Sequence, residues 1–101
     1  VWLLLFILTG IFQVSWATEL RGRIDTRNPY TGYFQPLPGA QVTIVNPFNG
    51  APLSTTYTGY DGFYYFSNVP PGQYGLVING MRNFPLGVPP MPAYDIPPIL
   101  F

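Results

Sequence analysis

After residue 17, apolar and polar residues alternate in short runs, and clusters of Gly, Pro and Asn separate the runs. Alternation with a period of two is typical of β-strands that bury one face. No window of helical length in this part keeps an apolar stripe of period 3.6 without a Pro or Gly inside it. The pattern therefore predicts an all-β sandwich of about seven short strands around one core.

The alternation also predicts which side chains enter the core. The predicted strands include 19–25, 40–45, 54–58, 63–66 and 73–78. Their predicted inward residues are Leu20, Gly22, Ile24, Ala40, Val42, Ile44, Tyr64, Phe66, Tyr74, Leu76 and Ile78. A domain of the 84 residues 18–101, without disulfides, buries a modest share of its surface. Its large aromatic residues are therefore expected to supply much of this core.

Turn chemistry separates the strands. Asp61-Gly62 is a turn that tolerates positive φ, Pro71-Gly72 fits the centre of a type II turn, and Asn79-Gly80 is typical of a type I′ hairpin. The segment 85–92 is rich in proline, which a central strand cannot hold, and we expect it to be an extended connection. The last residues, 94–101, are expected to form an edge strand, with a disordered tail as the alternative.

The first residues carry a different pattern. An apolar run from Val1 to Phe12 is shorter than the roughly 20 residues that span a bilayer, and Ser15 and Ala17 are the small residues that a signal peptidase requires. We expect 1–17 to be a signal peptide, truncated at its own N-terminus, and 18–101 to be the exported domain. The alternative is an uncleaved anchor, which would be the protein's only link to a membrane. The expected location is the periplasm or the cell exterior.

Composition removes several classes of function. Four basic and four acidic residues give zero formal charge, which offers no electrostatic basis for binding nucleic acid. The chain has no His, Cys or Lys, so the usual hydrolytic bases, cysteine nucleophiles and zinc ligands are missing. We therefore predict no enzyme activity, no cofactor and no metal. The lack of cysteine in an exported domain favours a bacterial source.

Four motifs in fixed order resemble the carboxypeptidase regulatory-like domain, a transthyretin-like sandwich. They are Gly22 with Ile24; "PLPGAQVTIV" at 36–45; Thr58, Gly62, Tyr64 and Phe66; and "VPPGQYGL" at 69–76. The resemblance covers nearly all of 18–101, and "IPPILF" is similar to the family's closing strand. It implies a single Greek-key, prealbumin-like β-sandwich without catalysis, of the general kind called carbohydrate-binding-like.

Two features of related domains are not expected here. Gly59 stands where the family often has Asp, and Asp61 is the single carboxylate in this turn, so a calcium site is not expected. The lysine–asparagine cross-links of related adhesin repeats are excluded because the chain has no Lys.

Aromatic residues that point away from the core form the candidate interaction surface: Tyr57, Tyr60, Phe63, Tyr65 and, beside them, Val77. Exposed, they would form an apolar patch of the kind that marks protein contacts. Alternatively, the loop 26–39 folds over them with Tyr33, Phe34 and Leu37. We expect a non-catalytic accessory module of the bacterial cell envelope that is structural or binds an envelope protein. The alternative is a carbohydrate-binding module that stacks sugars of a polysaccharide on surface Tyr and Phe side chains, which would include Tyr30, Tyr33 and Phe34 of the loop 26–39.

Overall fold

A computed structural model describes residues 17–101, apart from the side chain of Arg82. The predicted signal segment lies almost entirely outside this range. Between Ala17 and Phe101 the fold is all-β and has no helix that could cross a bilayer. The strands are β1 (Thr18–Arg27), β2 (Phe34–Pro36), β3 (Gln41–Val45), β4 (Pro52–Tyr57), β5 (Phe63–Val69), β6 (Gly72–Ile78), β7 (Arg82–Val88), β8 (Ala93–Asp95) and β9 (Ile99–Leu100).

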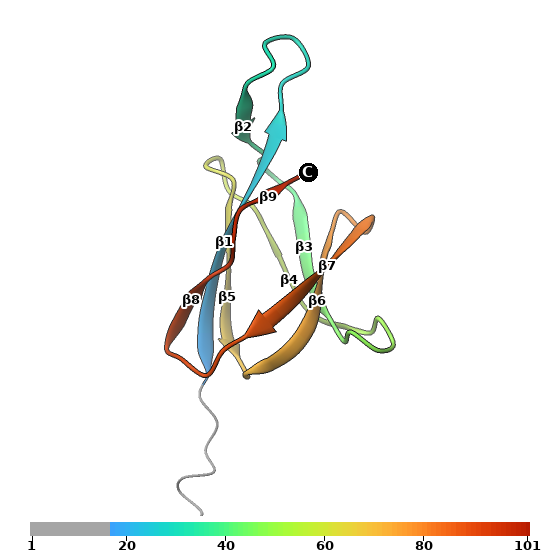
Figure 1. Cartoon of the computed structure of the whole chain (residues 1–101), viewed down its shortest axis with the longest axis vertical. Coiled ribbons are helices and arrows are strands. Elements are labelled where there is room, and N and C mark those ends of the chain that lie inside the picture. Colours follow the sequence, from blue (N-terminus) through green and yellow to red (C-terminus); the bar gives the residue numbers. More distant parts are fainter. Residues whose placement is uncertain (1–16) are drawn as a thin grey trace, which may run out of the picture.

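The strands form two sheets that face each other (Figure 1). One has the order β4-β3-β6-β7, and every pairing in it is antiparallel. The other is organised around β1, which pairs antiparallel with β2 and β5 and parallel with β8 and β9. The predicted sandwich is confirmed. Nine strands replace the expected seven because β2 was not predicted and because the predicted edge strand at 94–101 is divided into β8 and β9.

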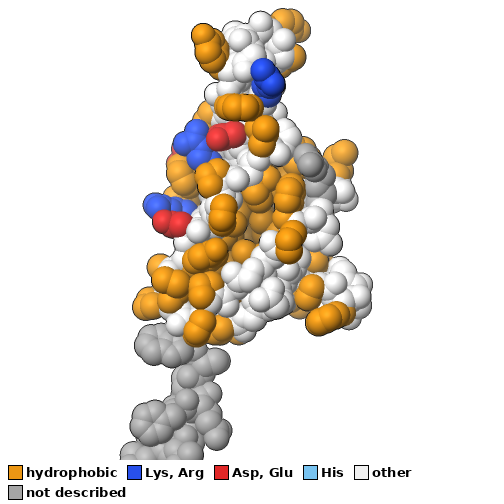
Figure 2. All heavy atoms as spheres, in the orientation of Figure 1, with side chains coloured by type: hydrophobic (Ala, Val, Ile, Leu, Met, Phe, Trp, Pro, Cys, Tyr) orange, Lys and Arg blue, Asp and Glu red, His pale blue; other side chains and the backbone are white. Residues whose placement is uncertain are grey.

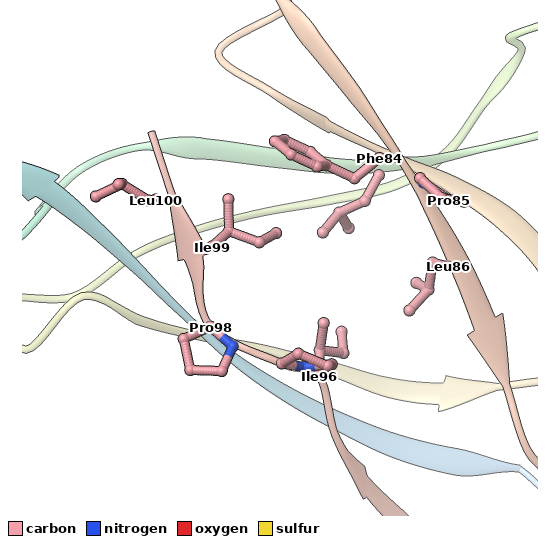
Figure 3. A pocket seen from close by; sticks show the side chains of 9 residues that line it. Phe84, Pro85, Leu86, Ile96, Pro98, Ile99 and Leu100 are labelled. Atoms are coloured by element: carbon pink, nitrogen blue, oxygen red, sulfur yellow. The ribbon is translucent and has the colours of Figure 1, made fainter.

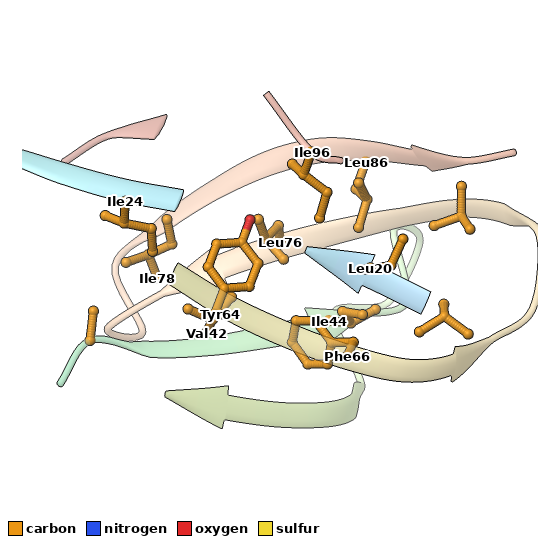
Figure 4. Close-up of a cluster of buried hydrophobic side chains, with 13 residues drawn as sticks. Leu20, Ile24, Val42, Ile44, Tyr64, Phe66, Leu76, Ile78, Leu86 and Ile96 are labelled. Carbon is orange, nitrogen blue, oxygen red and sulfur yellow. The ribbon is translucent and has the colours of Figure 1, made fainter. Parts of the chain in front are cut away.

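The core lies between the sheets and includes the predicted aliphatic side chains together with Tyr64 and Phe66 (Figure 4). Val69, Leu86, Val88 and Ile96, which the alternation did not assign to the core, are also buried in it, whereas the predicted core residue Tyr74 is only partly buried against it. Leu20 and Ile24 of β1 face Ile44 of β3 and Leu76 of β6, all at most 1% exposed. The Tyr64 and Phe66 rings of β5 meet edge to face with centroids 6.0 Å apart. Tyr64 is fully buried because its ring lies against Gly22 on the paired strand.

The C-terminal third differs from the prediction. Residues 85–88 belong to strand β7, which pairs with β6 over its whole length, and not to a connection. Pro85 is tolerated because β7 is the last strand of its sheet, where a missing N–H leaves no ladder partner unsatisfied. The segment 94–101 does lie at an edge, as two short strands interrupted by Pro97-Pro98.

Of the three predicted turns, two are confirmed and the one at Pro71-Gly72 differs. Asn79 and Gly80 both have positive φ, as a type I′ turn requires. The chain also turns at Asp61-Gly62, where Gly62 has φ +78°. Gly72 has φ +150°, which is far more extended than the type II turn predicts, and Asn68 takes the left-handed conformation at this end of β5.

Burial of Tyr64 has a measurable consequence for stability. Its hydroxyl finds no hydrogen-bond partner among the described residues, and burial raises the pKa of Tyr64 above its ordinary value of 10.0. We expect Tyr64→Phe to raise the free energy of unfolding by about 1 kcal/mol at neutral pH, since it removes an unsatisfied polar group. Above pH 10 the unfolded chain loses the Tyr64 proton while the folded chain keeps it, so wild-type stability falls by up to about 1.4 kcal/mol per pH unit from this residue.

Urea titrations of both proteins from pH 8 to 11.5 measure this difference. The advantage of Tyr64→Phe should widen above pH 10. Parallel curves for the two proteins would contradict the assignment of this pH dependence to Tyr64.

Candidate functional site

The turn between β4 and β5 holds the most exposed aromatic residue of the candidate surface. The Gly59 N–H donates to the Phe63 carbonyl at 3.0 Å, and the Gly62 N–H donates to the Gly59 carbonyl at 3.0 Å. The Asp61 carboxylate accepts the Phe63 N–H at 3.0 Å. These bonds close a tight turn whose side chain at its tip, Tyr60, is 96% exposed.

Below this turn the outer side chains of β4 and β5 border an open hollow of about 480 Å³. The hollow is lined by Tyr57, Gly59, Tyr60, Asp61, Phe63 and Tyr65, and we call it the aromatic hollow. Tyr57 comes from an edge of one sheet and Tyr65 from an edge of the other, so the hollow lies on the flank where the two sheets meet. The structure thus brings four of the five candidate residues to one place.

The fifth candidate, Val77, lies elsewhere. It pairs with Thr43 and Asn83 on the outer face of the four-stranded sheet and is half-buried. Val77 does not line the aromatic hollow. Sequence alternation places Val77 on an outward face correctly, but it does not distinguish the outer faces of two different sheets.

Phe63 is less exposed than the sequence suggested. The guanidinium carbons of Arg21 and Arg23 each lie 5.6 Å from its ring centroid, within the range of cation–π contacts. Arg21 forms an ion pair with Asp95 through two hydrogen bonds, and Arg23 forms an ion pair with Asp25 through a single hydrogen bond. The two arginines therefore partly cover the Phe63 ring, and the described charged side chains other than Asp61 lie along β1 and β8 (Figure 2).

The loop expected to cover the aromatic patch does not do so. Thr26 and Arg27 extend β1, and Phe34–Pro36 returns as β2, so the segment is a hairpin that projects beyond the sandwich (Figure 1). Tyr33 and Phe34 remain exposed at this hairpin, whereas Leu37 packs against the core. The covering alternative is wrong, because strand pairing with β1 carries the loop away from β5.

A second hollow on the same flank was missed by sequence analysis. It has a volume of about 380 Å³ and is lined by Ile44, Leu53, Ser54, Ser67, Asn68, Val69, Pro70 and Tyr74. Both strands that border it have an irregular register there, between Ser54 and Pro52 in β4 and between Phe66 and Val69 in β5. Such bulges bend the strands and open the end of the sandwich. The one sequence signal for the bulge in β5 was the asparagine at position 68, because asparagine tolerates the left-handed conformation that Asn68 adopts, with φ +58°.

The opposite flank has an apolar groove of about 280 Å³ (Figure 3). It lies between β7 and the segment that joins β8 to β9, and its lining includes Leu76, Leu86, Ile96 and Ile99. Figure 2 shows apolar side chains gathered over this region. Prolines interrupt both strand edges on this flank. Pro85, Pro97 and Pro98 line the groove, and Pro89 directly follows the end of β7.

No cluster of three or more acidic, His or Cys residues lies close enough to hold a metal ion in the part of the chain that the structure describes. Asp25 and Asp95 each pair with an arginine.

Comparison with known proteins identifies the fold. The sequence model of the carboxypeptidase regulatory-like domain matches residues 20–83, from β1 into β7. The chain belongs to this family. Among solved structures, a DUF3823 family protein from Bacteroides ovatus is 19% identical, with a TM-score of 0.49. That match covers 80% of this chain and 43% of the other. A search of curated proteins finds no match.

Within this carboxypeptidase regulatory-like domain the motif residues have structural tasks. The Thr58 hydroxyl donates to the Leu37 carbonyl at 2.6 Å and accepts the Ala40 N–H at 2.8 Å, which ties β4 to the start of β3. The Tyr74 hydroxyl donates to the Pro70 carbonyl at 2.6 Å and closes the reversal before β6. These motif residues thus hold turns of the sandwich in place.

Proposed function

We propose that this carboxypeptidase regulatory-like domain is an exported, non-catalytic module of the bacterial cell envelope that contacts a protein partner through the aromatic hollow. The observation that carries the proposal is the gathering of exposed Tyr57, Tyr60 and Tyr65 around one hollow on the flank of the sandwich. Tyrosines contribute large, rigid contact area at low conformational cost and are enriched at protein interfaces. An exposed apolar patch of this kind marks a contact site.

Sequence and chemistry support the non-catalytic part of the proposal. The chain contains no His, Cys or Lys, and its four carboxylates are Glu19, Asp25, Asp61 and Asp95. Two of the four are paired with arginines, and Asp61 accepts a backbone N–H in its own turn. Export is supported by the apolar run of Val1–Phe12, followed by small residues at Ser15 and Ala17.

Photo-crosslinking in cells tests the contact. A photoreactive side chain in place of Tyr60 should give a discrete crosslinked product with an envelope protein. Tyr30 is the matched control, because it is 95% exposed against 96% for Tyr60 but lies on the projecting hairpin. Products that are absent at position 60, or identical at both positions, would count against the aromatic hollow as a contact site.

The same hollow is also suited to a second occupant, a neutral polysaccharide. Tyrosine rings offer flat faces on which sugars stack, and the Asp61 carboxylate at the rim can accept hydrogen bonds from sugar hydroxyls. Co-sedimentation with insoluble polysaccharides distinguishes the two functions. Retention that Tyr60→Ser abolishes and Tyr30→Ser leaves intact would favour the carbohydrate function over the protein contact.

A further inference from the structure

The strand edges of the sandwich are unequally protected. An edge strand exposes unpaired backbone groups that can pair with another chain, and proline, charge or a bulge prevents this. Proline interrupts β7, β2 ends at Pro36, and Pro97-Pro98 separates β8 from β9. By contrast, the stretch 54–57 of β4 contains neither a proline nor a charged residue.

Hydrogen bonds around β3 show which backbone groups of β4 are free. The Thr58 N–H donates to the Ala40 carbonyl at 3.0 Å, whereas the Gln41 carbonyl accepts from Asn79, on the side of β6. Backbone groups alternate between the two neighbours along a strand, so Val42 and Ile44 bond to their β4 partners. Those partners are Thr56 and Ser54.

The intervening residues of β4, Thr55 and Tyr57, therefore turn their N–H and C=O groups towards the open flank. The 3.0 Å contact between the Thr43 and Thr55 hydroxyls agrees with this assignment, because residues of a non-hydrogen-bonded pair lie closer together. β4 thus presents two donors and two acceptors in a regular, uncharged stretch.

The neighbouring edge, β5, is less suited to pairing. The Phe63 N–H is bound to Asp61 and the Phe63 carbonyl accepts from Gly59, so the first residue of this edge is already occupied. The far end of β5 has left-handed Asn68 in its bulge. The regular part of β5 therefore leaves Tyr65 alone with outward backbone groups for a partner, whereas β4 offers both Thr55 and Tyr57.

We propose that β4 pairs antiparallel with β4 of a second copy of this chain, about a two-fold axis at Thr56. In that register Thr55 lies opposite Tyr57 of the second copy and Tyr57 lies opposite the second copy's Thr55. Each pair exchanges two hydrogen bonds, so the four outward groups of each chain are satisfied. The two four-stranded sheets become one sheet of eight.

Side chains and charge fit this pairing. On the outer face each Tyr57 ring packs on a β-branched Thr55, a favourable cross-strand combination. On the inner face the two Thr56 hydroxyls meet at the axis. Because 54–57 has no charged residue, two identical strands approach without like-charge repulsion. The pairing does not depend on the aromatic hollow binding another partner, although it brings the second copy close to Tyr57.

The absence of native cysteine makes the axis directly testable. Non-hydrogen-bonded residues opposite each other have Cα atoms about 4.5 Å apart, within disulfide reach. Under mild oxidation the full chain with Thr56→Cys should form covalent dimers roughly tenfold faster than the full chain with Gln73→Cys. Gln73 is an exposed position on β6, away from this edge. Equal rates for the two variants would overturn the proposal.

A proline substitution tests the backbone bonds. Adding Thr55→Pro to Thr56→Cys removes an outward N–H that β3 does not use, so crosslinking should fall to the Gln73→Cys rate while circular dichroism stays unchanged. Adding Thr55→Val removes only the hydroxyl and should preserve crosslinking. Crosslinking that survives Thr55→Pro in a folded protein would overturn the β4 pairing, as would a loss with Thr55→Val.

Discussion

Gly22→Ala is expected to lower the free energy of unfolding by about 3 kcal/mol, a large part of the stability of a small domain. A Cβ atom at position 22 would lie 2.2 Å from Cζ and from the hydroxyl oxygen of Tyr64, far inside van der Waals contact. Tyr64 is fully buried, so its ring cannot swing into solvent to make room. Either the ring leaves its rotamer or β1 and β5 separate, and both changes disturb the centre of the core.

Chemical denaturation measures this loss, and Gly87→Ala is the matched control. Gly87 also lies in a strand, but its added Cβ would meet only the end of the flexible Gln73 side chain, at 3.3 Å. By itself, Tyr64→Leu, which shortens the side chain, should lower the free energy of unfolding. In the Gly22→Ala background the same substitution should lower it by less. Strictly additive effects in this double-mutant cycle would show that the Gly22–Tyr64 contact does not cause the loss.

Thr58→Val is expected to destabilise the domain by about 2 to 4 kcal/mol. Valine keeps the shape of threonine but removes the hydroxyl that donates to Leu37 and accepts from Ala40. Thr58 and Ala40 are both buried, so the Ala40 N–H would be left without a partner and shielded from water. The loss therefore includes desolvation of an orphaned donor as well as two broken hydrogen bonds.

Thr58→Ser is the control for this prediction, because it keeps the hydroxyl and removes one methyl group. Thermal unfolding of the two variants should place Thr58→Ser close to the wild type and Thr58→Val well below it. If the two variants unfolded at the same temperature, the methyl group and not the hydroxyl network would be the source of stability at this position.

The core was predictable because period-two alternation is a local property of a strand. Leu20, Ile24, Val42, Tyr64 and Leu76 are buried as the pattern predicted. The second half of strand β7, residues 85–88, was missed because Pro85 excludes a central strand, and sequence alone does not show which strand will be last in its sheet. Edge position is a property of the whole fold.

The candidate site was predictable only in part, for a related reason. Alternation assigns Phe63, Tyr65 and Val77 to outward faces, but it does not tell which outward faces adjoin. Tyr57 and Tyr65 meet because β4 and β5 are edges of different sheets on one flank. The arginine cover of Phe63 depends on the register of β1 against β5. The hollow lined by Ser54 and Asn68 depends on two bulges that the local sequence pattern does not predict.

The pairing of β1 with β8 and β9 has a consequence for how the chain folds. Leu20 pairs with Tyr94, and Ile24 pairs with Ile99, so the first strand of the domain is completed by its last residues. Closing such long loops is entropically costly, and topologies dominated by distant contacts fold slowly. During synthesis this sheet stays open until residue 99 has emerged, so a chain arrested before β9 should remain accessible to proteases and chaperones.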